Sequence, residues 1–114
     1  MARLPTSFSI EKQLSTTPIN IVNAAASATQ SVVTTLSFFN TSATEYRKVT
    51  VYRIASGSTA LETNVIAEGS VGPRKSWVNV EILSEVFTNG QYAQAVVDAG
   101  TDVNVNCSGD IFSS

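Results

Sequence analysis

The chain has 114 residues, a length that suits one domain with its own hydrophobic core. Hydrophobic residues make up 43% and charged residues only 14%, with a net charge of −2, so the composition differs from that of disordered segments and offers no basic footprint for nucleic acid. The sequence contains no histidine, which excludes a Ser-His-Asp triad and any histidine-containing zinc site.

Residues 1–14 are predicted to form an N-terminal arm or an edge strand. Residues 1–7 contain Arg3 and Pro5 and show no clear period, which favours an arm that is loose or ordered only by a partner. Phe8, Ile10 and Lys12 then alternate with polar residues, as in a first strand at a sheet edge. We expect this segment to contribute to an intersubunit interface through Arg3, Leu4, Phe8 and Ile10.

The next part of the chain alternates between strand and turn signals. Residues 19–22 form a short predicted strand after Pro18, which fits a first strand position. The alanine-rich residues 23–30 allow a helical turn, although a loop is at least as consistent with the missing apolar stripe. Residues 31–40 are rich in branched and aromatic side chains and predict a strand, and residues 40–44 have the composition of a turn.

Residues 48–55 show the cleanest strand pattern in the chain. Arg53 shares its predicted face with Val49 and Val51, so we expect it to enter a buried or intersubunit ion pair with Glu62 or Glu68. A short strand over residues 63–67 comes next and is expected to end at residues 68–70.

Residues 76–83 alternate again, with Val78, Val80 and Ile82 on the expected core face. Trp77 then falls on the opposite face, together with residues 79 and 81. The pattern therefore predicts that Trp77 lies outside the core of its own subunit or under a neighbour, and an outward tryptophan is an interface candidate.

The C-terminal part predicts two further strands, over residues 91–97 and 102–112. Asn89 and Gly90 give the sharpest turn signal, and residues 98–101 are expected to turn the last hairpin. Cys107 lies in the alternating last strand and is interpreted as a small core residue. The whole pattern predicts an all-β fold, a single antiparallel β-sandwich of about eight short strands over residues 15–114.

Candidate chemistry is sparse. The carboxylate pairs Glu81 with Glu85 and Asp98 with Asp102 lie at strand ends and turns, where acidic residues usually bond their own backbone. Asp98, Asp102 and Asp110 cluster near the C-terminus, which raises the option of a calcium site. A turn is preferred for residues 98–102, with a weak loop-bound cation left open. Residues 69–75 match no phosphate-binding pattern. We therefore predict no enzyme, with no catalytic, cofactor-binding or metal-ligating residue.

Three stretches resemble small β-sandwich structural proteins of tailed bacteriophages. They are Val32 to Ala43 with its Asn-Thr-Ser turn, Arg47 to Tyr52 with alternating Val and Thr, and Asn89 to Ala95 followed by Thr101 to Val105. The resemblance covers roughly residues 31–112 and implies a virion protein without catalytic residues. It does not distinguish capsid decoration, neck or collar, tail and fibre.

We therefore expect a virion structural subunit assembled in the host cytoplasm, most consistent with a head decoration or neck/collar protein. Its expected partners are copies of itself and other virion proteins such as capsid, connector or tail subunits, with no nucleic acid and no membrane. The alternative is a carbohydrate-binding module or tail-fibre-associated adhesin, since Trp77, Tyr46, Tyr52 and Tyr92 are candidates for an aromatic sugar platform.

Overall fold

The computed structural model describes residues 2–26, 28–55, 57–60, 62–78, 85–88 and 90–113. These residues form nine strands and a short 3₁₀ turn, η1, over Glu62–Asn64. No helix in the described part of the chain is long and apolar enough to cross a membrane. The strands are β1 Ala2–Gln13, β2 Ile19–Val22, β3 Thr29–Asn40, β4 Arg47–Ile54, β5 Val65–Val71, β6 Ser76–Val78, β7 Val86–Thr88, β8 Tyr92–Val97 and β9 Val103–Ser113.

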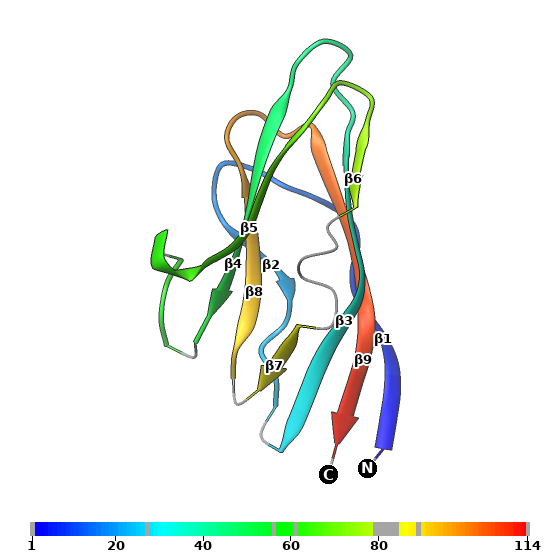
Figure 1. Ribbon diagram of the computed structural model, residues 1–114, viewed down its shortest axis with the longest axis vertical. Helices are drawn as coiled ribbons and strands as arrows, with labels where there is room; N and C mark the ends of the chain where they lie inside the picture. The colour runs from blue at the N-terminus through cyan, green and yellow to red at the C-terminus, as the bar shows by residue number, and fades with distance from the viewer. Residues whose placement is uncertain are drawn as a thin grey trace.

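The strands pack as two antiparallel sheets (Figure 1). Sheet A has the order β1-β9-β3-β6, with β7 also paired to β3, and sheet B has the order β2-β8-β4-β5. Among the described pairings, β4 and β5 are the one pair of consecutive strands that bond to each other. A chain that crosses repeatedly between two sheets in this strand order forms a jelly roll, here with β7 as a fifth strand of sheet A. The predicted single antiparallel β-sandwich is confirmed.

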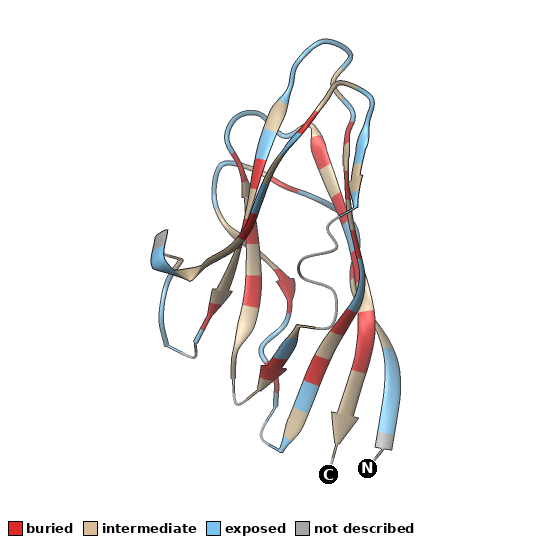
Figure 2. Cartoon of the chain, viewed as in Figure 1, coloured by how far each residue is buried: buried red, intermediate tan, exposed pale blue. Residues whose placement is uncertain are grey.

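The core lies between the sheets, and alternate residues of the central strands supply it (Figure 2). In β9 the buried apolar side chains are Val103, Val105 and Cys107, as the alternating pattern predicts. Cys107 is confirmed as a buried residue, and burial raises the pKa of its thiol to about 12. The largest fully buried side chains include Phe38, Phe87, Leu14, Ile21, Leu36 and Ile54.

Two predicted turns join strands of different sheets. The turn over residues 98–101 connects β8 in sheet B to β9 in sheet A, so the expected last hairpin is wrong. Gly90, with a φ of 83°, lies between β7 in sheet A and β8 in sheet B, while Asn89 lies outside the described residues. Turn residues specify that the chain reverses, but they do not specify the layer in which it continues.

β5 is longer than expected because residues 68–70 continue the strand and pair with Thr50, Val49 and Lys48. The glycine at position 69 therefore does not end the strand. By contrast, the loop interpretation of the alanine-rich segment is confirmed, since residues 23–26 and 28 contain no helix.

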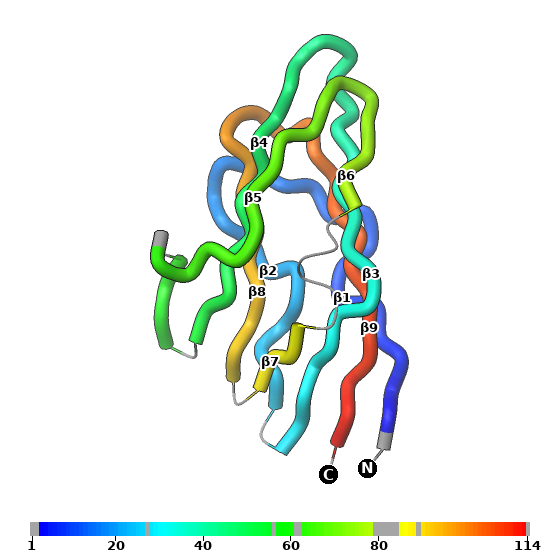
Figure 3. Tube along the Cα trace, in the orientation of Figure 1, coloured from blue at the N-terminus to red at the C-terminus, as the bar shows by residue number. Residues whose placement is uncertain are grey.

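The N-terminal segment is ordered by its own chain. Residues 2–7 pair with residues 108–113 of β9, so the expectation that residues 1–7 are loose or ordered only by a partner is wrong for the described part. β1 is an edge strand of sheet A, and both termini leave the same end of the molecule (Figure 3). Register shifts after Ser7 and Ser9 break the predicted alternation, so Ser9 is buried while Ile10 is 71% exposed.

Candidate functional site

Trp77 lies between the sheets rather than outside them. β6 pairs with β3 so that Trp77 stands opposite the buried Phe38, and residues directly opposite share one face of a sheet. The two rings stack with centroids 5.4 Å apart, while Val78 is 58% exposed. The predicted orientation is therefore wrong, because the register with β3 decides the face of a three-residue strand.

The backbone of β5 closes the other side of this tryptophan. A Cβ atom at Gly69 would stand only 2.6 Å from Cζ2 of Trp77. Glycine at this strand position allows the indole to approach sheet B closely. Trp77 thus packs between Phe38 of sheet A and the backbone of Gly69 in sheet B, within one subunit.

Arg53 links the two sheets. It faces inward with Val49 and Val51, as expected, and its Nη2 lies 3.2 Å from Oε1 of Glu85. The same nitrogen donates to the carbonyl of Val86 at 3.0 Å, and the guanidinium lies 4.9 Å from the centroid of the Phe87 ring. Arg53 therefore joins β4 to the start of β7 inside the subunit.

Glu68, one of the two partners expected for Arg53, binds other residues. Glu68 instead pairs with Lys48 at 3.2 Å and accepts a hydrogen bond from Thr50 at 3.1 Å. The side chain of Glu62 lies outside the described residues. The sequence pattern placed Arg53 on the correct face, but Glu85 is separated from it by more than thirty residues, and no local signal connects the two.

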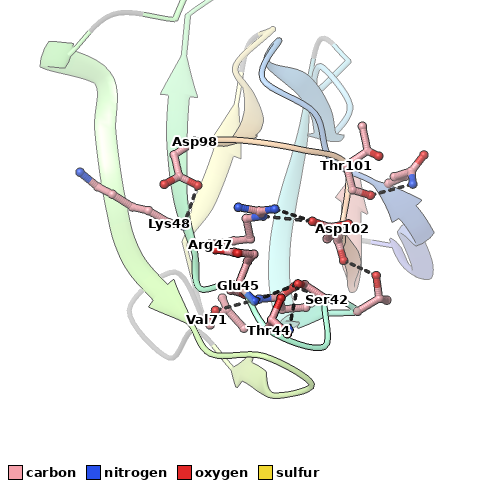
Figure 4. Close-up of polar contacts among 12 residues, drawn as sticks. Ser42, Thr44, Glu45, Arg47, Lys48, Val71, Asp98, Thr101 and Asp102 are labelled. Atoms are coloured by element: carbon pink, nitrogen blue, oxygen red, sulfur yellow. Dashed lines mark hydrogen bonds and ion pairs between the residues drawn. The ribbon is translucent and has the colours of Figure 1, made fainter.

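The acidic loop between β8 and β9 is part of the fold (Figure 4). Asp102 accepts hydrogen bonds from Nη2 of Arg47 at 2.8 Å and from its Nε at 3.1 Å. Asp98 accepts the backbone N–H of Lys48 at 3.0 Å. The described residues contain no group of three or more His, Cys, Asp or Glu side chains that could hold a metal ion. Both carboxylates are thus bonded to the start of β4, at Arg47 and Lys48, and not to the backbone of their own turn as expected.

The Asn-Thr-Ser turn is also structural. Asn40 is fully buried, and its Nδ2 donates to the carbonyls of Glu45 at 2.7 Å and Val71 at 3.0 Å. Its Oδ1 accepts the N–H of Ser42 at 3.0 Å. The side chain therefore joins the end of β3, the following loop and the end of β5 in one network.

The aromatic residues do not form one platform. Trp77 is held between the sheets, whereas Tyr46 is 71% exposed beside the β5–β6 turn. Tyr92 is partly buried and donates its hydroxyl to the carbonyl of Ser58 at 3.0 Å. Tyr52 is partly buried within β4. An aromatic sugar platform that includes Trp77 is therefore not available on the surface.

The remaining interface candidates gather on β1. Leu4 is 62% exposed, Ile10 is 71% exposed and the Arg3 side chain is 63% exposed. Phe8, in contrast, packs against the core. We call the two exposed apolar side chains, Leu4 and Ile10, the edge-strand surface. Both side chains are exposed on the same edge strand, where a neighbouring molecule could cover them.

The backbone of β1 is poorly suited to accept another strand. Val33 donates its N–H to the carbonyl of Glu85 at 3.3 Å, on the side of β3 away from β9. Because backbone groups alternate in direction along a strand, the N–H and C=O of Val32 point toward β9. Those of Asp110, which pairs with Val32, point back toward β3. Pro5 pairs with Asp110 on the other side of β9, so its backbone nitrogen points to the free edge of the sheet. A proline nitrogen carries no hydrogen, so it cannot donate to an added strand.

Two irregularities strengthen this effect. β1 changes register between Ser7 and Ser9 and again between Ser9 and Lys12, and Glu11 adopts a φ of 45°. Proline, charged residues and bulges on an edge strand all oppose edge-to-edge pairing. We infer that contacts at β1 depend on side chains rather than on added backbone hydrogen bonds.

A polar cleft opens on the outer face of sheet A. Its volume is about 480 Å³, and it contains an ion pair in which Nε of Arg3 lies 3.0 Å from Oδ1 of Asp110. The sequence does not predict that Arg3 and Asp110 pair, because their proximity depends on pairing between the distant strands β1 and β9. We call this site the hydroxyl cleft; its lining residues are Arg3, Pro5, Thr6, Ser7, Thr34, Ser108, Gly109 and Asp110.

A smaller, mostly apolar cavity lies on the opposite side of β1. Its volume is about 180 Å³, and its lining includes Phe8, Ile111 and residues 23–26. Ligand pockets usually occupy about 300–1,000 Å³, so the hydroxyl cleft has the size of a small-molecule site and this cavity does not.

A chain in a solved viral structure resembles this chain. The chain is similar over 96% of its length to a chain in the structure of infectious bursal disease virus Gx strain, with 17% sequence identity and a TM-score of 0.44. This chain spans 31% of the length of that chain. No protein-family model and no curated protein matches the sequence. At this level of similarity the likeness does not extend to function.

Proposed function

We propose that this chain is a structural subunit of a virion that acts through repeated protein–protein contacts, as a head decoration or neck/collar protein of a tailed phage. The edge-strand surface carries the proposal, since Leu4 and Ile10 are largely exposed on a strand that is otherwise paired into the sandwich. The jelly roll is compatible with this role, although the fold alone does not decide function.

The mechanism is the presentation of a fixed contact surface by a rigid sandwich. β1 is paired with β9 over residues 2–13, so its position is defined by the fold. A neighbouring copy that covers Leu4 and Ile10 would remove their apolar area from water, at about 25 cal/mol per Å². Many such modest contacts become strong in a symmetric assembly.

The test combines solution mass with location. Light scattering after size-exclusion chromatography is expected to give a homo-oligomer, and immunogold labelling of purified phage particles is expected to mark the head or neck at several copies. A protein that stays monomeric and is absent from particles would contradict the proposal. Label confined to the tail or fibres would keep the virion role and reject the head or neck position.

Deletion of residues 1–14 is a poor test of this contact surface. The deletion would remove the fully buried Leu14 and leave β9 unpaired on the side that β1 now covers. A loss of assembly would then reflect unfolding as much as loss of contact. Substitution of the exposed side chains separates the two effects.

The alternative of a carbohydrate-binding module or tail-fibre-associated adhesin no longer rests on Trp77. A Trp77→Ala change would remove a residue that packs against Phe38, so loss of glycan retention in that variant would not identify a sugar site. The observation that favours glycan recognition is the hydroxyl cleft, which lies on another part of the molecule.

A further inference from the structure

We propose that the hydroxyl cleft on the outer face of sheet A binds a neutral glycan through a vicinal diol. This inference goes beyond the structural role and does not depend on the oligomeric state. The cleft is built by three adjacent strands, β1, β9 and β3, and it is distinct from the edge-strand surface formed by Leu4 and Ile10.

Irregular strand pairing creates the cleft. β1 shifts register between Ser7 and Ser9, and β3 shifts register between Val33 and Thr35, both opposite the same part of β9. Bulges bend a strand and increase its local twist. At this level Gly109 passes so close to β3 that an added Cβ would stand 1.9 Å from the carbonyl oxygen of Val32. The cleft is therefore a fixed feature of the sheet.

The chemistry of the lining favours hydroxyl groups over other ligands. Four of the lining residues, Thr6, Ser7, Thr34 and Ser108, carry hydroxyls that both donate and accept hydrogen bonds. Thr6 already donates to the carbonyl of Leu4, and Ser108 shares a hydrogen bond with Thr35. Within the described residues Thr34 makes a long 3.4 Å bond to the carbonyl of Ser108, so its hydroxyl is the most available of these. Pro5 and Gly109 are the lining residues without a polar side chain, so the cleft offers little apolar area to an aliphatic or aromatic ligand.

The Arg3–Asp110 ion pair at one end of the cleft favours a ligand without net charge. The Asp110 side chain is 12% exposed and the Arg3 side chain is 63% exposed, and their contact uses Nε of Arg3 and Oδ1 of Asp110. Among the described residues the two Nη groups of Arg3 have no partner. Free guanidinium donors thus lie beside a carboxylate acceptor.

A neutral diol fits this pair best. One hydroxyl can accept from Nη of Arg3 while its neighbour donates to Asp110, and both hydrogen bonds are charge-assisted. An anion would be repelled by the carboxylate of Asp110, and a cation by the guanidinium of Arg3. Neutral sugars present adjacent hydroxyls at this spacing, and the volume of about 480 Å³ has room for one to a few sugar units.

The experiment is an NMR titration of the ¹⁵N-labelled full chain. The probes are the neutral methyl glycosides of mannose, galactose, glucose, rhamnose and N-acetylglucosamine, with a sulfated disaccharide and a lysine tripeptide as charged probes. We expect at least one neutral glycoside to shift amide signals of Ser7, Thr34, Ser108 and Asp110 at millimolar concentration.

Matched variants assign the site. Arg3→Gln is expected to weaken binding about tenfold, the loss for one charge-assisted hydrogen bond, and Thr34→Val about threefold to tenfold. Thr50→Val makes the same hydroxyl-to-methyl change on sheet B and should leave binding unchanged. The proposal is overturned if no neutral glycoside shifts these signals, if a charged probe binds more tightly, or if Arg3→Gln binds as well as the wild type.

Discussion

The two edge strands of sheet A, β6 and β1, differ in whether their large apolar side chains are buried. At one end β6 places Trp77 between Phe38 and the backbone of Gly69, inside the sandwich. At the other end β1 leaves Leu4 and Ile10 largely exposed while its backbone is paired to β9. The aromatic residue thus contributes to stability, and the aliphatic residues are free to contact a partner. The sequence pattern predicted an interface role for all three residues, and the structure removes Trp77 from that set.

The largest expected effect is at the β6 end. Trp77→Ala should lower the free energy of unfolding by about 3 kcal/mol, because it removes a ring packed against both sheets. Val78→Ala, at a 58% exposed position, should change it by less than about 0.5 kcal/mol. Urea unfolding measures both. A Trp77→Ala protein that keeps its stability but changes its oligomeric mass would restore the interface assignment.

The next effect concerns the loop network that holds β3 to β5. Asn40→Ala should cost about 2–3 kcal/mol, because the carbonyls of Glu45 and Val71 lose their donor. Asn23→Ala is the matched control, since Asn23 is exposed. Equal unfolding midpoints for the two variants would show that the turn does not depend on the Asn40 side chain.

Cys107 reports whether β1 stays in the sheet. It pairs with Ser9 of β1, and burial raises the pKa of its thiol from 9.0 to about 12. Because the thiolate is the reactive form, we expect slow reaction with Ellman's reagent in the folded protein and fast reaction in urea. Fast reaction of the folded protein would indicate that β1 leaves β9.

The Cys107 thiol also makes the free energy of unfolding depend on pH, and the sign of this dependence follows from the raised pKa. The folded state holds the thiol proton more tightly than the unfolded chain, so this contribution is complete below pH 9.0 and is lost as the pH rises toward about 12. In that window the wild type should lose up to about 1.4 kcal/mol per pH unit more than Cys107→Ala. Parallel stability curves for the two proteins would contradict this.

A smaller effect is expected at the link between β4 and β7. The Arg53–Glu85 pair is partly exposed, at 31% and 37%, so solvent screens it and its coupling should be about 0.5–1 kcal/mol. A double-mutant cycle with Arg53→Met and Glu85→Gln measures that coupling. The matching cycle with Glu68→Gln should give a value near zero, and a larger coupling to Glu68 would reverse the assignment.

The sequence predicts the fold class well because alternation is a local property. β4, β8 and β9 are visible as Val- and Ala-rich periods, and the buried Cys107 is predicted by the same period. The face of Arg53 is also predicted correctly. Local patterns therefore indicate that strands exist and which side of each strand is buried.

Features that depend on pairing between distant strands are not predictable in this way. The three residues of β6 are too few to define a face, so the orientation of Trp77 depends on its register with Phe38. The partner of Arg53, the crossing turns and the hydroxyl cleft depend on which strands become neighbours. The bulges of β1 also leave no local signal in the sequence. Pro5 is nevertheless compatible with an edge strand.

The most direct test of the central claim, that copies associate through β1, is sedimentation equilibrium of a Leu4→Ser, Ile10→Ser double variant. Its stability should stay within about 0.5 kcal/mol of the wild type, since both side chains are exposed. The control is Tyr46→Ser, which changes an equally exposed residue at 71% on a different loop. We predict that the double variant sediments as a monomer at concentrations where the wild type and the control form oligomers. An unchanged oligomeric mass in the double variant would contradict association through β1.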